Sequence, residues 1–123
     1  MRYMGFVKMD PKLTDPPQAL MDAMDIHIQD CLERGVFLDG GGLYATSFRG
    51  EVKVRDGEVT TFDGPFTEGR ETVGGYSVLE FRDHEEAMAE AQFMVDLHLK
   101  HWPGWEGSVE VRRIAGPDEV GNL

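Results

Sequence analysis

The stretch from Arg55 to Phe66 reads RDGEVTTFDGPF, and its first half predicts a β-hairpin. Asp56-Gly57 separates two β-type runs, Val52–Val54 and Val59–Thr61. An Asp-Gly pair in this position favours the two-residue turn whose positive φ angles match the twist of paired strands. The chain is therefore expected to contain a tight hairpin here.

A compact loop follows the hairpin at Asp63-Gly64-Pro65-Phe66. Aspartate can accept a backbone hydrogen bond from two residues further on, glycine can take positive φ, and proline has a fixed φ and no N–H. Two interpretations remain open. Asp63 either only stabilises the turn, or the loop presents Asp63 and Phe66 to a pocket.

These residues resemble those of a known family. The DGPF sequence at 63–66, together with residues 54–57, 74–76 and 107–112, is similar to the DGPF-domain branch of the YCII-related proteins. The resemblance extends to residues 2–4, 35–38 and 42–43, so it covers almost the whole chain. It implies a ferredoxin-like βαββαβ fold that pairs into a dimeric α/β barrel, and it supplies no established activity.

Length and composition predict a single small domain. The 123 residues, 41% of them hydrophobic, suit one core over residues 1–115 with a flexible tail at 116–123. A net charge of −11 argues against nucleic acid and anionic membranes as partners. Cys31 is the single cysteine, which excludes an internal disulfide, and no segment resembles a signal peptide or a membrane span, so we expect a cytoplasmic protein.

The N-terminal half predicts a strand and a helix. Residues 2–9 are apolar on both faces and predict a central strand. Asp15 is the expected N-cap of a helix that ends at Gly35. The glycine run at 39–42 is interpreted as a connection into a strand at 43–47, because it follows a helix and lacks the lysine of a phosphate-binding loop. The predicted buried stripe of the helix is Met21, Met24, Ile28, Cys31 and Leu32.

The C-terminal half predicts a second strand, helix and strand. Residues 69–75 are expected to form a mobile connection, and residues 76–82 alternate as a strand. Asp83 and Glu86 form the capping box of a second helix, which Pro103 ends. The expected buried stripe of this helix is Ala87, Met88, Ala91, Met94, Val95 and Leu99. The predicted class is α+β: a ferredoxin-like antiparallel sheet with an extra hairpin and both helices on one face.

The histidines are the candidate acid–base residues. His27 lies at the border of the first helical stripe, and His98 lies on the second stripe near Trp102. Each is either a core histidine bonded to the backbone or a titrating group with an ordinary pKa near 6.5. His98 and His101 are three residues apart, but no cysteine or clear carboxylate accompanies them, so we predict neither a metal nor a cofactor.

The leading hypothesis is a cofactor-independent domain that handles a small molecule. Whether it is an enzyme stays open, and so does a noncatalytic ligand sensor. In the dimeric barrel that the resemblance implies, the sheet face with Arg112 lines the interior, and a homodimer is expected. A third alternative is a protein-interaction accessory domain, for which the resemblance suggests an extracytoplasmic-function sigma factor. The candidate site residues are Asp63 with His98 or His27 as acid–base partner, Arg112 as anion contact, and Phe66, Tyr44 and Trp102 as ligand contacts.

Overall fold

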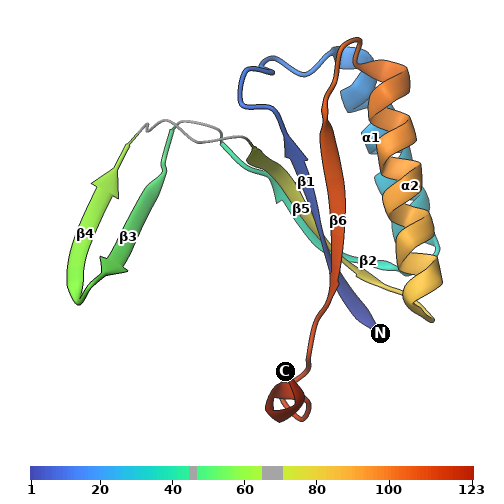
Figure 1. Ribbon diagram of the computed structural model, residues 1–123. Helices are drawn as coiled ribbons and strands as arrows, with labels where there is room; N and C mark the ends of the chain where they lie inside the picture. The colour runs from blue at the N-terminus through green and yellow to red at the C-terminus, as the bar shows by residue number, and fades with distance from the viewer. Residues whose placement is uncertain (45–46, 65–70) are drawn as a thin grey trace.

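The computed structural model describes residues 1–44, 47–64 and 71–123 (Figure 1). The described elements are, in chain order, β1 (Arg2–Met9), α1 (Gln18–Glu33), β2 (Phe37–Gly42), β3 (Gly50–Arg55), β4 (Glu58–Asp63), β5 (Thr72–Glu80), α2 (His84–His101), β6 (Gly107–Arg113) and the short 3-10 helix η1 (Val120–Asn122).

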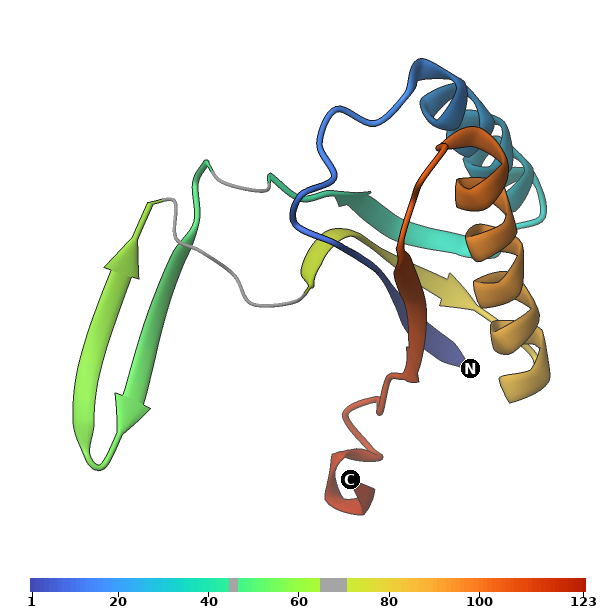
Figure 2. The ribbon, with the colours of Figure 1, turned by 45° about the horizontal axis from the view of Figure 1, so that its top comes forward.

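The larger sheet has the strand order β2-β5-β1-β6, and every neighbouring pair is antiparallel. A βαββαβ chain forms this order in a ferredoxin-like fold. Both helices lie on one face of the sheet (Figures 1 and 2). The α+β class and the central position of β1 are therefore as the sequence predicts.

Strands β3 and β4 form a separate two-stranded sheet that extends away from the larger one (Figures 1 and 2). Asp56 and Gly57 join them with φ angles of 52° and 80°, the conformation of a type I′ turn. The register pairs Val54 with Val59 and Val52 with Thr61, so these four side chains share one face of the hairpin.

The predicted cap of α1 is wrong. The residue before the helix is Pro17, which makes no side-chain cap, and Asp15 has a φ of 56°. A residue that precedes proline is disfavoured in the α region, so neither Asp15 nor Pro16 joins the helix. The predicted end is correct: Gly35 has a φ of 73°, and the N–H groups of Gly35 and Val36 donate to the carbonyls of Leu32 and Cys31.

The predicted helical stripes are only partly correct. In α1 the buried residues are Leu20 and Cys31, whereas Met21 and Leu32 are exposed. In α2 the buried residues are Ala87, Ala91 and His98, whereas Met88 and Leu99 are exposed. A helix buries only the side chains along its line of contact, and helical spacing alone does not position that line.

The glycine run is part of edge strand β2 and not a connection. Gly40 pairs with Ser77 and Gly42 with Gly75 of β5. A Cβ on Gly40 would lie 2.8 Å from the Phe37 ring and 3.0 Å from the Tyr76 carbonyl oxygen, so close approach explains the glycine. No strand forms at residues 43–44, and residues 45–46 of the strand predicted there lie outside the described part. Residues 72–75 of the connection expected at 69–75 belong to β5, which begins at Thr72, and residues 69–70 lie outside the described part.

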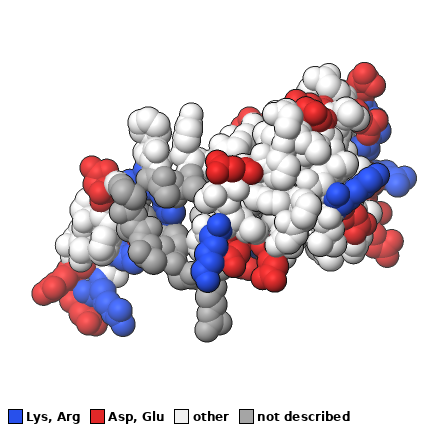
Figure 3. All heavy atoms as spheres, turned by 90° about the horizontal axis from the view of Figure 1, so that it is seen from above, with Lys and Arg blue, Asp and Glu red and all other residues white. Residues whose placement is uncertain are grey.

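The second helix begins as predicted, because the Asp83 side chain accepts a hydrogen bond from the Glu86 N–H at 2.9 Å. The face in Figure 3 shows basic side chains interspersed with acidic and uncharged ones. Arg113, the last residue of β6, forms an ion pair at 2.9 Å with Glu119 in the tail. None of the described helices is both long enough and apolar enough to cross a bilayer.

Candidate functional site

A cavity of about 590 Å³ lies between the helices and the larger sheet. Its floor includes Tyr3, Val7 and Leu79, and the helices contribute Met24 and Met94. Most of the wall is therefore apolar, and the volume is in the range of small-molecule sites.

The ionisable side chains on the cavity wall carry no fixed positive charge. Among the described lining residues are two carboxylates, Asp25 and Glu90, and two histidines, His27 and His98, but no lysine or arginine. The field inside the cavity therefore disfavours an anionic ligand.

The central polar feature of the wall is a histidine–carboxylate pair between the helices. Nε2 of His27 in α1 donates a hydrogen bond to Oε1 of Glu90 in α2 at 2.5 Å, and the two side chains are only 11% and 14% exposed. The Phe93 ring stacks on the imidazole with 4.4 Å between centroids. A carboxylate that orients an imidazole is a typical acid–base arrangement.

Cys31 lies beside this pair. Its side chain is buried, its Sγ is 3.6 Å from Nε2 of His27, and Nη2 of Arg34 donates to it at 3.4 Å. Burial raises the pKa of the Cys31 thiol, and the negative charges of Glu90 and Asp30 raise it further, against the opposing effect of Arg34. The thiol is therefore protonated at neutral pH.

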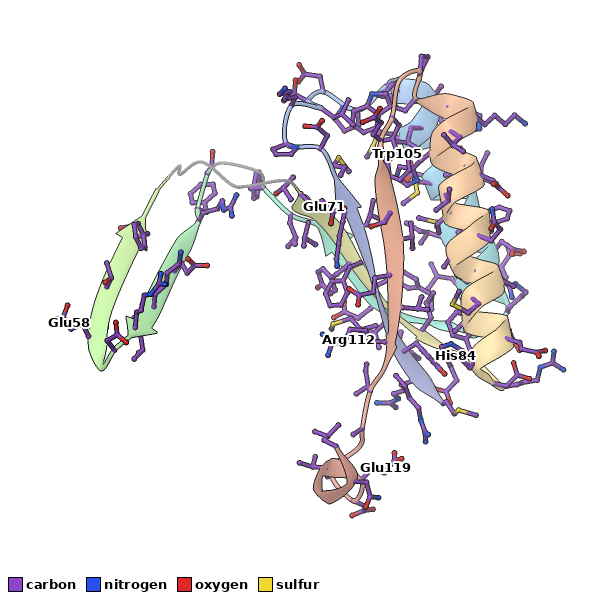
Figure 4. The ribbon with its side chains drawn as sticks, viewed as in Figure 1. Glu58, Glu71, His84, Trp105, Arg112 and Glu119 are labelled. Atoms are coloured by element: carbon purple, nitrogen blue, oxygen red, sulfur yellow. The ribbon has the colours of Figure 1, made fainter. Side chains whose placement is uncertain are left out.

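His98 lies elsewhere in the cavity wall and has the environment of a neutral core histidine. It is 3% exposed, its Nδ1 donates to the Met94 carbonyl at 2.7 Å, and Trp105 packs against its ring with 4.8 Å between centroids. Burial lowers the pKa of His98, and the bond to the carbonyl only partly offsets this. Figure 4 shows Trp105 between β6 and α2.

The YCII-related domain family matches residues 1–94, which span β1 to the middle of α2. The chain belongs to the YCII-related family. The matched span contains His27, Cys31 and Glu90 of this YCII-related domain, whereas His98 lies beyond it. No curated protein matches the chain.

The YCII-related domain does not bring Asp63 together with either candidate histidine. Asp63 is exposed at the end of β4, and β4 pairs with β3 and not with the larger sheet. His27 bonds to Glu90 instead, and His98 bonds to a backbone carbonyl. Strands β3 and β4 form a sheet of their own, and Asp63 at the end of β4 does not line this cavity.

The remaining predicted contacts are distributed over several places. Trp102 is buried and lines the cavity, and Tyr44 also lines it but is 74% exposed and packs edge-on against Phe48. Arg112 is exposed on the face opposite the helices, because its neighbour Val111 faces the cavity (Figure 4). Arg112 is thus not an anion contact of this cavity, and Phe66 lies outside the described residues.

Sequence reasoning missed two polar contacts of this domain. Glu90 is three residues after Ala87 and four before Met94, so a carboxylate on the buried stripe of α2 was the signal for it. His84 is exposed, yet its Nδ1 forms a 3.0 Å hydrogen bond with the Tyr3 hydroxyl. No spacing rule indicates that second contact, because it joins residues 81 positions apart.

Proposed function

We propose that this YCII-related domain binds a small, mainly apolar molecule in the cavity between the helices and the sheet, without an organic cofactor. The observation that supports it is the His27–Glu90 pair on the wall of an apolar cavity of about 590 Å³. A few convergent polar groups in an apolar cavity are characteristic of small-molecule sites.

The charges on the wall restrict the ligand class. Asp25 and Glu90 disfavour an anion, whereas the second oxygen of Glu90 can accept a hydrogen bond from a hydroxyl or amino group. We therefore propose a neutral or cationic ligand that carries such a donor. The same pair can act as a general acid or base on a ligand proton next to His27.

The methyl groups of the methionines can report where a ligand binds. Met9, Met21, Met24 and Met94 line the cavity, whereas Met88 is exposed on the outside of α2. With the methionine methyls labelled with ¹³C, titration with phenol should shift the lining methyls and leave Met88 in place. Benzoate, which is also a monosubstituted benzene but is anionic, should bind more weakly. Shifts of equal size at Met88 and Met94, or tighter binding of benzoate, would contradict the proposal.

We also propose that the domain forms a homodimer through the sheet face that the helices leave open. Met4, Phe6, Tyr76 and Val78 lie together there, because β1 pairs Met4 with Val78 and Phe6 with Tyr76. Burying these apolar side chains away from solvent is favourable, and a two-fold contact between two copies of the chain would bury them. Light scattering should give twice the chain mass of 13.8 kDa, and a stable monomer would refute the dimer.

The hairpin supports a second candidate function, protein interaction. Val52, Val54 and Val59 are 66%, 70% and 66% exposed on one face, and an isolated two-stranded hairpin is at best marginally stable. The DGPF sequence at 63–66 supports the DGPF branch, whose resemblance suggests a sigma factor as partner. Hydrogen exchange distinguishes the occupants: hairpin amides protected in the protein alone indicate a second copy, and protection only after sigma factor is added indicates that partner. Rapid exchange in both samples would refute an interaction role.

A further inference from the structure

We infer that His27, Asp30, Cys31 and Glu90 form a binding site for a divalent transition metal, with zinc as the best match to the ligand types. His27, Asp30 and Cys31 each offer a ligand atom, and these three atoms all lie within 4.8 Å of one another. They occupy one turn of α1, while Glu90 approaches from α2. Zinc binds imidazole nitrogen, thiolate sulfur and carboxylate oxygen.

The spacing of the atoms fits tetrahedral zinc. Bonds of about 2.0 Å to nitrogen and about 2.3 Å to sulfur at a tetrahedral angle separate the two ligand atoms by about 3.5 Å. The Cys31 Sγ and His27 Nε2 atoms are 3.6 Å apart. The Glu90 oxygen, 2.5 Å from Nε2, has to move outward by about 0.8 Å to occupy a third vertex, a small rotation for a glutamate side chain.

The charges around the site also suit a dication. A Cys31 thiolate and the Glu90 carboxylate balance the two charges of the metal, and the charge of Asp30 is paired with Arg34. Metal binding releases the thiol proton to solvent. Arg34 donates from Nε to Asp30 at 3.0 Å and from Nη2 to Cys31 at 3.4 Å. Such bonds to ligand atoms from outside the coordination shell orient the ligands.

The site has one dry side and one accessible side. Cys31 is 2% exposed, and both His27 and Glu90 line the cavity, whereas Asp30 is exposed to solvent. A metal can therefore enter past Asp30, and with four protein ligands its tetrahedral coordination is complete. This inference goes beyond the proposed function, because the metal alone is the probe and no organic ligand is needed.

Cobalt(II) added to the chelator-treated protein tests the inference. We expect one equivalent to produce the thiolate-to-cobalt charge-transfer band in the near ultraviolet and the visible bands of tetrahedral cobalt, with zinc displacing both. Cys31→Ser should abolish the charge-transfer band, and His27→Gln and Glu90→Gln should each weaken cobalt binding by at least about tenfold. His101→Gln and Asp22→Asn, which change a histidine and a carboxylate outside the cluster, are the matched controls and should bind as the wild type does.

Thiol protection provides a second measurement that needs no cysteine variant. Zinc should slow the reaction of Cys31 with a disulfide reagent in the wild type and in His101→Gln, but not in His27→Gln. Circular dichroism establishes that each variant is folded. Absence of the charge-transfer band in the folded wild type, or equal loss of affinity in the control variants, would overturn the inference. So would unchanged binding in both His27→Gln and Glu90→Gln, since the thiolate would then bind cobalt alone.

Discussion

Replacing Ala91 with leucine tests whether the cavity is open in solution. Ala91 is buried in α2 and lines the cavity. Leucine adds three carbon atoms there, and at about 0.8 kcal/mol per buried methylene the greatest possible gain is about 2.4 kcal/mol. Because part of the new side chain lies against existing neighbours, we expect Ala91→Leu to raise the free energy of unfolding by about 1–2 kcal/mol.

The assay is urea unfolding followed by the fluorescence of Trp102 and Trp105, both of which are buried. Ala89→Leu is the matched control, because Ala89 is exposed two residues away in the same helix, and its effect should stay within about 0.5 kcal/mol. Phenol should bind less tightly to Ala91→Leu than to Ala89→Leu. A loss of about 1–3 kcal/mol in Ala91→Leu would be the signature of overpacking and would refute an open cavity.

Three further predictions concern the strands and the core histidine. Gly40→Ala should lower the free energy of unfolding, measured in urea, by about 1–3 kcal/mol, because its new Cβ would lie 2.8 Å from the Phe37 ring. The control Gly41→Ala should lower it much less, because its Cβ would lie 3.6 Å from the Tyr76 ring. Equal losses of stability would contradict the β2 register. Gly57→Val forces positive φ at a cost of about 1–3 kcal/mol, and it should speed hydrogen exchange in β3 and β4 while leaving the larger sheet unchanged; slower or unchanged exchange in the hairpin would contradict the turn. Since burial lowers the folded-state pKa of His98, its contribution to stability is complete above the unfolded value of about 6.5 and falls as the pH drops toward the lowered pKa. His98→Asn should flatten that part of the stability–pH curve, and an unchanged slope would show that another group is responsible.

The sequence predicted correctly those helix ends that depend on a few neighbouring residues. The Asp83 cap and the end of α1 at Gly35 depend on a few adjacent residues, and both are present in the structure. The α1 start was wrong for a local reason as well, because the constraint that Pro16 and Pro17 place on preceding residues outweighed the capping tendency of Asp15.

The candidate site depends on contacts that sequence spacing does not contain. His27 and Glu90 are 63 positions apart, and their pairing requires the two helices to lie side by side on the sheet. The DGPF sequence directed attention to Asp63, because turn chemistry and the resemblance coincide there. Both signals identified the hairpin correctly but did not indicate the cavity, because among the described strands β4 pairs only with β3.

The cavity and the metal cluster share Glu90, and two variants one residue apart separate their roles. Glu90→Gln removes a charge and a metal ligand but keeps the size of the side chain and an oxygen that can accept from a hydroxyl. Cobalt binding should therefore weaken while the lining methionines still respond to phenol. Ala91→Leu fills the cavity without changing a ligand atom, so phenol binding should weaken while the cobalt spectrum persists. If either variant abolished both kinds of binding in a folded protein, the two sites would be one, and the metal would have to be part of the ligand contact. If Glu90→Gln abolished only cobalt binding and Ala91→Leu abolished only phenol binding, the apolar cavity and the metal cluster would act as independent sites on the same pair of helices.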